Sequence, residues 1–72
     1  MNALHALNHI ENGGAVLVSL PGCLSSVFHL DGYDIISENS EIGVCGGHTP
    51  AGTLQHFLII LRAGGTLSAA DL

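Results

Sequence analysis

Five histidines and two cysteines are the side chains in this 72-residue sequence best suited to hold a metal ion or to act as nucleophiles. His5 and His9 are four residues apart, so a helix would turn both imidazoles toward one divalent ion such as zinc. Zinc needs three or four protein ligands, and no Cys-x-x-Cys or His-Glu-x-x-His spacing supplies the others. The simpler interpretation is that both histidines are solvated.

A second group of candidates follows the predicted strands. Cys23, Cys45 and His48 each lie in a turn region, where functional side chains are commonly displayed. Cys45 and His48 flank two glycines, so a thiolate and an imidazole could face a common metal or ligand. Thr49 and Pro50 begin a predicted helix whose free N–H groups could hold a small anion. The alternative is that the cysteines pack as small hydrophobic residues and the glycines only form a turn.

Catalysis is not expected from these residues. A Cys-His nucleophile pair needs an orienting Asp or Asn and an oxyanion site. Asp31, Asp34 and Asn39 are available, but no spacing selects one of them. The carboxylates lie in or beside predicted turns, where capping and hydration explain them. The sequence therefore argues against an enzyme.

The elements that must position these side chains begin with a short helix. Residues 2–12 carry apolar side chains at spacings of three and end at two glycines. Residues 15–20 form a nearly continuous apolar run, which predicts a strand buried on both faces. Residues 26–30 and 33–37 flank Asp31-Gly32, which predicts a type I′ hairpin. A polar loop and a short strand over 42–45 follow.

A second, strongly apolar helix is predicted from Pro50 to Ala63, with Thr49 as its cap. Leu54, Phe57, Leu58 and Leu61 fall at i, i+3, i+4 and i+7 and form its predicted core stripe. Ile59 and Ile60 widen the apolar surface to most of the circumference, so one side of the helix is assigned to the sheet and the other to a subunit interface. An alternative interpretation makes 53–61 a strand. The tail after Gly65 resembles a capping box with little helix after it, and we expect a frayed end. The residues predicted to supply the interface are Leu54, Phe57, Leu58, Ile59, Ile60 and Leu61.

Together these elements predict a single α+β domain over residues 1–72: a helix, about four short and mostly antiparallel strands, and an apolar C-terminal helix. Hydrophobic residues make up 47% of the chain and charged residues only 10%. Ordinary soluble domains carry about 25% charged residues. A monomer would therefore expose apolar patches, which usually mark contact sites, so we expect a homo-oligomer or another protein partner.

The charge balance excludes two classes of partner. The chain has one basic residue, Arg62, and a formal net charge of -5. Nucleic acid and anionic membrane surfaces draw affinity from clustered lysines and arginines, so neither is an expected partner. A signal segment and a membrane-spanning run are not expected either. With only two cysteines, the simplest localisation is the cytoplasm, with both thiols reduced; the alternative is a single bridge between Cys23 and Cys45.

The sequence resembles no known family over a useful length, so its function is inferred from composition. The first hypothesis is a small, acidic, non-catalytic interaction module of the inhibitor or adaptor type, acting as a homo-oligomer through protein–protein contacts. The alternative is a ligand- or metal-binding protein whose Cys/His pocket lies at a subunit interface, where several copies would supply the missing ligands.

Overall fold

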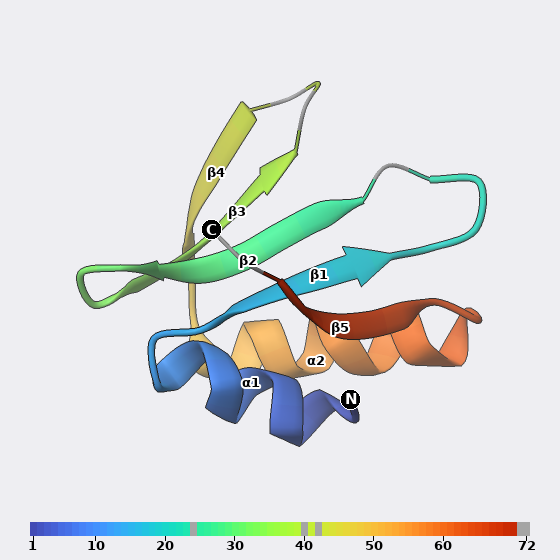
Figure 1. Ribbon diagram of the computed structural model, residues 1–72, viewed down its shortest axis with the longest axis horizontal. Coiled ribbons are helices and arrows are strands. Elements are labelled where there is room, and N and C mark those ends of the chain that lie inside the picture. The colour runs from blue at the N-terminus through green and yellow to red at the C-terminus, as the bar shows by residue number, and fades with distance from the viewer. Residues whose placement is uncertain (24, 40, 42, 71–72) are drawn as a thin grey trace.

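The computed structural model describes residues 1–23, 25–39, 41 and 43–70, and Figure 1 shows their arrangement. The described residues form two helices and five strands, with four consecutive strands between the helices. In order they are α1 (Ala3–Glu11), β1 (Ala15–Ser19), β2 (Ser26–Asp31), β3 (Asp34–Asn39), β4 (Gly43–His48), α2 (Pro50–Arg62) and β5 (Thr66–Ala70). The α+β class predicted from the sequence is confirmed.

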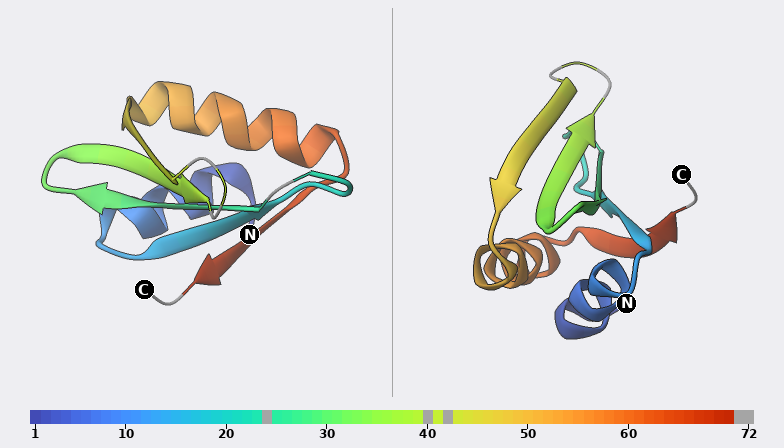
Figure 2. Two further views of the ribbon diagram at one scale, coloured as in Figure 1. Left: turned by 90° about the horizontal axis from the view of Figure 1, so that it is seen from above. Right: turned by 90° about the vertical axis from the view of Figure 1, so that its left-hand side faces the viewer.

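The strands form one sheet in the order β4-β3-β2-β1-β5, and every neighbouring pair is antiparallel. Both helices lie on the same side of this sheet, as the two views in Figure 2 show. Helix α2 starts beside the edge strand β4 and leads to the opposite edge, where β5 pairs with β1. The result is a two-layer domain with one sheet face that carries no helix.

Strand β5 was missed in the sequence prediction, which had four strands and a frayed tail. Thr66–Ala70 pairs with all of β1 over five consecutive residues. Leu67 alone supplies a large apolar side chain to the core, where it is 4% exposed. One large side chain among small ones produces no visible period of two, so the alternation that identifies a strand is hidden.

The β2–β3 hairpin is confirmed, but its turn is shifted by one residue. Asp31 pairs with Asp34, so Gly32 and Tyr33 form the two-residue loop. Gly32 has a φ of 64°, whereas no described residue other than glycine has a positive φ. Positive φ at the first loop position alone fits a type II′ turn rather than the predicted type I′.

The middle of the sheet also extends further than the sequence indicated. The predicted polar loop over 38–41 is wrong at its start, because β3 continues through Asn39. Strand β4 does not stop at Cys45 but crosses both glycines to reach His48. Ile35 pairs with His48 and Ser37 with Cys45, so β4 contains one extra residue. Such a bulge accommodates Gly47, whose φ is 80°. Position 42, where the predicted strand began, lies outside the described residues.

The predicted helix starts are both formed by side-chain caps. The Asn2 side chain accepts from the His5 backbone N–H at 2.8 Å, and the Thr49 hydroxyl accepts from that of Gly52 at 3.0 Å. Pro50 occupies the first turn of α2, where its missing donor costs nothing. The alternative strand over 53–61 is therefore excluded.

The core lies between the sheet and the helices, and α2 faces it with a different stripe from the one predicted. Thr53, Phe57 and Ile60 are buried, whereas Leu58 is 40% and Ile59 55% exposed. The hydrophobic core cluster consists of Ala3, Ala6, Leu7, Ile10, Val16, Val18, Phe28, Ile35, Phe57, Ile60 and Leu67. Leu54 and Leu61 are partly buried against it.

Candidate functional site

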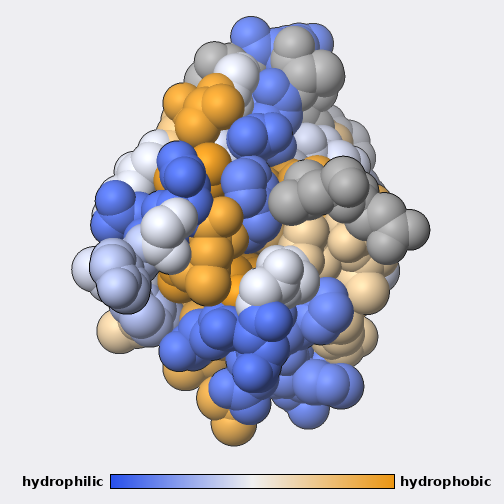
Figure 3. Space-filling model, turned by 60° about the vertical axis from the view of Figure 1, so that its left-hand side comes forward, coloured by the Kyte–Doolittle hydropathy of each residue, from blue (hydrophilic) through white to orange (hydrophobic). Residues whose placement is uncertain are grey.

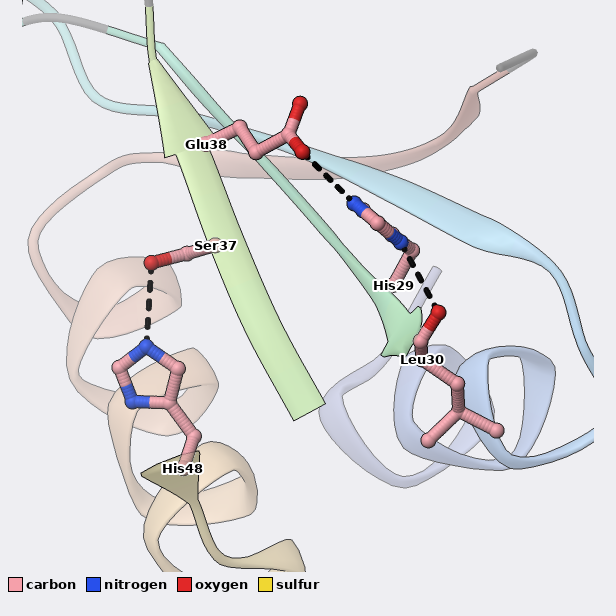
Figure 4. A network of polar contacts seen from close by, with 5 residues as sticks. All are labelled: His29, Leu30, Ser37, Glu38 and His48. Atoms are coloured by element: carbon pink, nitrogen blue, oxygen red, sulfur yellow. Dashed lines mark hydrogen bonds and ion pairs between the residues drawn. The ribbon is translucent and has the colours of Figure 1, made fainter. Parts of the chain in front are cut away.

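Two polar contacts on β3 bring histidines together with residues of other strands, one on each face of the sheet. Figure 4 shows Ser37 and Glu38 pointing to opposite sides of β3. Ser37 meets His48 of β4 on the face that carries the helices, and Glu38 meets His29 of β2 on the other face. These two histidine contacts are the candidate functional groups of the sheet.

The His29 ring is held at both of its nitrogens. Its Nδ1–H donates to the Leu30 carbonyl oxygen at 3.0 Å, and Nε2 lies 3.2 Å from the Glu38 carboxylate. Both partners accept hydrogen bonds when Glu38 is ionised, so both contacts form together when the ring is protonated. The His29 side chain is 15% exposed and that of Glu38 44%. The pair therefore lies at the surface of the helix-free face.

His48 belongs to an aromatic cluster on the other face. Its Nε2 is 3.0 Å from the Ser37 hydroxyl, and its ring centroid is 5.3 Å from that of Phe28. The His56 ring of α2 stacks on Phe28 with centroids 5.5 Å apart. Partial burial lowers the pKa of His56, and the neighbouring His48 lowers it further. The cluster thus favours neutral His56.

The Ser37–His48 contact has the reach of a nucleophile and its base. A working pair also needs a group that orients the histidine and a space for the substrate. Among the described residues, no carboxylate contacts His48. The ring instead packs against Phe28. The contact is better explained as one that holds the edge strand β4 to the rest of the sheet.

The predicted ligand group of Cys23, Cys45, His48 and Thr49 is only partly brought together. Cys45 lies opposite Ser37 on β4 and is exposed, close to His48 in the same strand. Thr49 follows directly, but its hydroxyl is already used to cap α2. Cys23 is exposed in the loop between β1 and β2, and β2 and β3 separate this loop from β4. Both cysteines are free thiols.

The candidate metal ligands His5, His9, Cys45 and His48 are spread over two elements, α1 and β4. His5 and His9 lie on α1, and the His9 ring packs closely against Gly14. Within the described part of the chain, no three His, Cys, Asp or Glu side chains are placed to hold a metal ion.

The six residues predicted as an interface separate into three kinds. Phe57 and Ile60 are core residues of the domain itself. Leu54 and Leu61 pack against that core and are partly buried. Leu58 and Ile59 remain exposed, so on α2 they alone among the six are fully available for contact with another chain.

The helix-free face of the sheet is a surface that the sequence indicated only in part. One row of side chains crosses all five strands, and the pairing register defines it as Val44, Glu38, Val27, Leu17 and Ser68. In the neighbouring row, Ile36 lies opposite His29. The apolar run over 15–20 was the signal for this face, since it predicted burial on both sides of β1.

A pocket of about 200 Å³ opens where the hairpin loop, the end of α1 and the start of α2 meet. These three segments lie together at the left of Figure 1. Figure 3 turns this end of the molecule forward and shows a strip of hydrophobic side chains bordered by hydrophilic ones. The residues that line the pocket are Glu11, Leu30, Gly32, Tyr33, Ile35 and Pro50. This pocket could not be predicted from the sequence, because its lining comes from four separate elements.

Comparison with known proteins identifies no relative: no family model, no curated protein and no solved structure matches this chain. Among the described residues, neither helix has the length and apolar character required to cross a membrane. Function is therefore inferred from the surfaces and contacts of the fold itself.

Proposed function

We propose that this protein is a non-catalytic interaction module that self-associates through the helix-free face of its sheet. The observation that carries the proposal is the composition of this face. An antiparallel sheet with one face toward solvent normally alternates apolar and polar side chains. Here Leu17, Val27, Ile36 and Val44 all lie on the face without helices. Val44 is 63% exposed, Leu17 and Val27 are half-buried, and Ile36 is already buried within the single chain. A second copy would cover Val44 and the exposed parts of Leu17 and Val27.

The total surface area shows that the fold is not loose. The described chain exposes 4376 Å². A compact monomer of 7.4 kDa is expected to expose about 4,200 Å². The domain is therefore as compact as an ordinary monomer. Among the described residues, Val44 is the large hydrophobic residue of the helix-free face that remains exposed, whereas Leu4, Leu58 and Ile59 are exposed on the helices.

The size of the face sets the expected strength of association. Five strands spaced about 4.8 Å apart, each about five residues of 3.4 Å, give a projected area of roughly 400 Å² per copy. Two copies would cover roughly 800 Å², whereas stable complexes bury about 1,200–2,000 Å². We therefore expect a weak, reversible dimer, with a dissociation constant in the micromolar range or above.

The net charge of the chain opposes this dimer. Each copy carries a formal charge of -5, and its only basic residue, Arg62, ends α2. Repulsion between two acidic copies is screened by salt, with a screening length of about 10 Å at 0.1 M and about 3 Å at 1 M. Added sodium chloride should therefore strengthen the dimer, as apolar contacts do not weaken in salt.

The test is a pair of matched substitutions followed by sedimentation equilibrium. Val44→Lys alters the helix-free face at a side chain that is 63% exposed, and Ile59→Lys makes the same change on α2 at one that is 55% exposed. Each adds one positive charge at an exposed site, so both variants should fold. We expect Val44→Lys to shift the equilibrium to monomer and Ile59→Lys to leave the dimer in place.

The opposite outcomes are equally clear. If Ile59→Lys dissociates the dimer and Val44→Lys does not, the interface lies on α2 beside Leu58, as the sequence predicted. If the unmodified protein stays monomeric at millimolar concentration and high salt, self-association is wrong and the face serves another partner.

A further inference from the structure

The pocket at the hairpin end has a lining of mixed chemistry. Ile35 is buried and Leu30 half-buried, and with Pro50 they supply apolar surface. Tyr33 is fully exposed at the tip of the hairpin loop, and Glu11 supplies a carboxylate at the end of α1. An apolar lining with one aromatic ring and one carboxylate is suited to an organic cation that has an aliphatic stem.

The charges around this pocket are all of one sign. Asp31 and Asp34 face each other directly across the first pair of the hairpin, next to the pocket residues Gly32 and Tyr33. Like charges opposite each other in a sheet are destabilising. No basic side chain pairs with them or with Glu11 in the part of the chain that the structure describes.

The single arginine cannot relieve this repulsion. Arg62 is in the last turn of α2, whereas Pro50 at the other end of the same helix lines the pocket. Twelve residues of α-helix separate the two by about 18 Å. A cation for this end of the molecule must therefore come from another molecule.

We propose that the pocket binds a lysine side chain of a protein partner. The stem would lie along Leu30 and Pro50, the ammonium would approach Glu11, and the Tyr33 ring would close over the cation. The pocket holds about 200 Å³, against roughly 30 Å³ for one water in the liquid, so the end of a lysine side chain has room. This proposal is independent of self-association through the helix-free face, because Leu30 and Ile35 lie on the opposite face of the sheet and the other lining residues come from the helices and the hairpin loop.

The test is a titration of ¹⁵N-labelled protein with N-acetyl-lysine N-methylamide, followed through the backbone amides of Gly32 and Tyr33. N-acetyl-norleucine N-methylamide, which keeps the aliphatic stem but lacks the ammonium, is the matched neutral probe. We expect saturable shifts with the lysine probe, weaker binding at 0.5 M salt because of screening, and much smaller shifts with the norleucine probe.

Two substitutions of equal charge separate the pocket from the general acidity of the chain. Glu11→Gln removes the pocket carboxylate, whereas Glu41→Gln removes one beyond β3, at the end of that strand away from the hairpin. We expect Glu11→Gln to weaken lysine binding about fivefold or more, the factor that one contact ion pair contributes even in bulk water. Glu41→Gln should change it less than twofold.

Tyr33 provides an independent measurement. Tyr33→Phe should retain binding and Tyr33→Ala should weaken it, because the ring face rather than the hydroxyl attracts the cation. Equal shifts with the lysine and norleucine probes, or equal losses in Glu11→Gln and Glu41→Gln, would overturn the proposal. So would the absence of shifts with the lysine probe at tens of millimolar.

Discussion

Thr53→Val should stabilise this protein, although it alters one of the most buried residues of α2. Thr53 is 1% exposed, and among the described residues its hydroxyl has no hydrogen-bond partner. Its neighbours in the α2 stripe, Phe57 and Ile60, belong to the hydrophobic core. A buried hydroxyl without a partner is unfavourable because it has lost its hydrogen bonds to water.

The magnitude follows from removing this desolvation cost. An unsatisfied buried polar group costs about 1–3 kcal/mol, and valine keeps the branched shape while replacing the hydroxyl with a methyl group. Threonine and valine have similar helix propensities, so the backbone contributes little. We expect the free energy of unfolding to rise by about 1–2 kcal/mol. For a domain of this size, each kcal/mol shifts Tm by about 4–8 °C.

The matched control is the same substitution four residues earlier. Thr49 caps α2 through its hydroxyl, so Thr49→Val should lower the free energy of unfolding by about 1 kcal/mol. Thermal melts and urea titrations of both variants followed by circular dichroism measure these changes. The reasoning is refuted if Thr53→Val lowers Tm, because the hydroxyl must then have a partner in solution.

Three further predictions concern packing, pH and salt. Gly65→Ala should destabilise the fold by about 1–3 kcal/mol, because the new Cβ would lie 2.6 Å from the Ser19 carbonyl oxygen; Gly46→Ala, with its nearest contact at 3.5 Å, is the control in urea titrations. The pKa of His56 is lowered by burial and then by His48, so the unfolded chain binds the proton more readily. Stability from this group is present above about pH 6.5 and is lost as pH falls through the folded-state pKa. His56→Gln should therefore lose less stability than the unmodified protein in melts between about pH 7.5 and 5, and equal losses would contradict the assignment. Sedimentation equilibrium should show tighter dimers in 0.5 M than in 0.05 M salt, whereas an unchanged or weaker dimer would argue against charge repulsion.

Local signals in the sequence were enough to place most of the elements. The start of α2 was predictable because Thr49 and Pro50 have the chemistry of a cap and a first turn, and the end of α1 was predictable because two glycines follow it. The β2–β3 hairpin was predictable from Asp31-Gly32, although the turn type was not. Glycine can supply the positive φ at either loop position, so pairing decides which residues form the loop.

The missed features depend on contacts between distant residues. Strand β5 exists because it pairs with β1, and its own five residues carry almost no pattern. The core stripe of α2 includes Thr53 rather than Leu58 because the position of the helix on the sheet decides which side is buried. His48 was singled out beside Cys45, but its contacts are Ser37 and Phe28 on other strands. No local spacing could have indicated them.

The pairing of β1 with β5 also sets an order of folding. Ala15 and Ala70 are partners although most of the chain lies between them, whereas the pairs of the β2–β3 hairpin are close in sequence. Local pairs close faster than distant ones, so the β2–β3–β4 meander should form early and β5 should dock late. Until it docks, β1 presents an open edge of apolar residues, the kind of edge that invites pairing between chains. A slow last step during synthesis would therefore expose the nascent protein to aggregation, and docking of β5 would end that exposure.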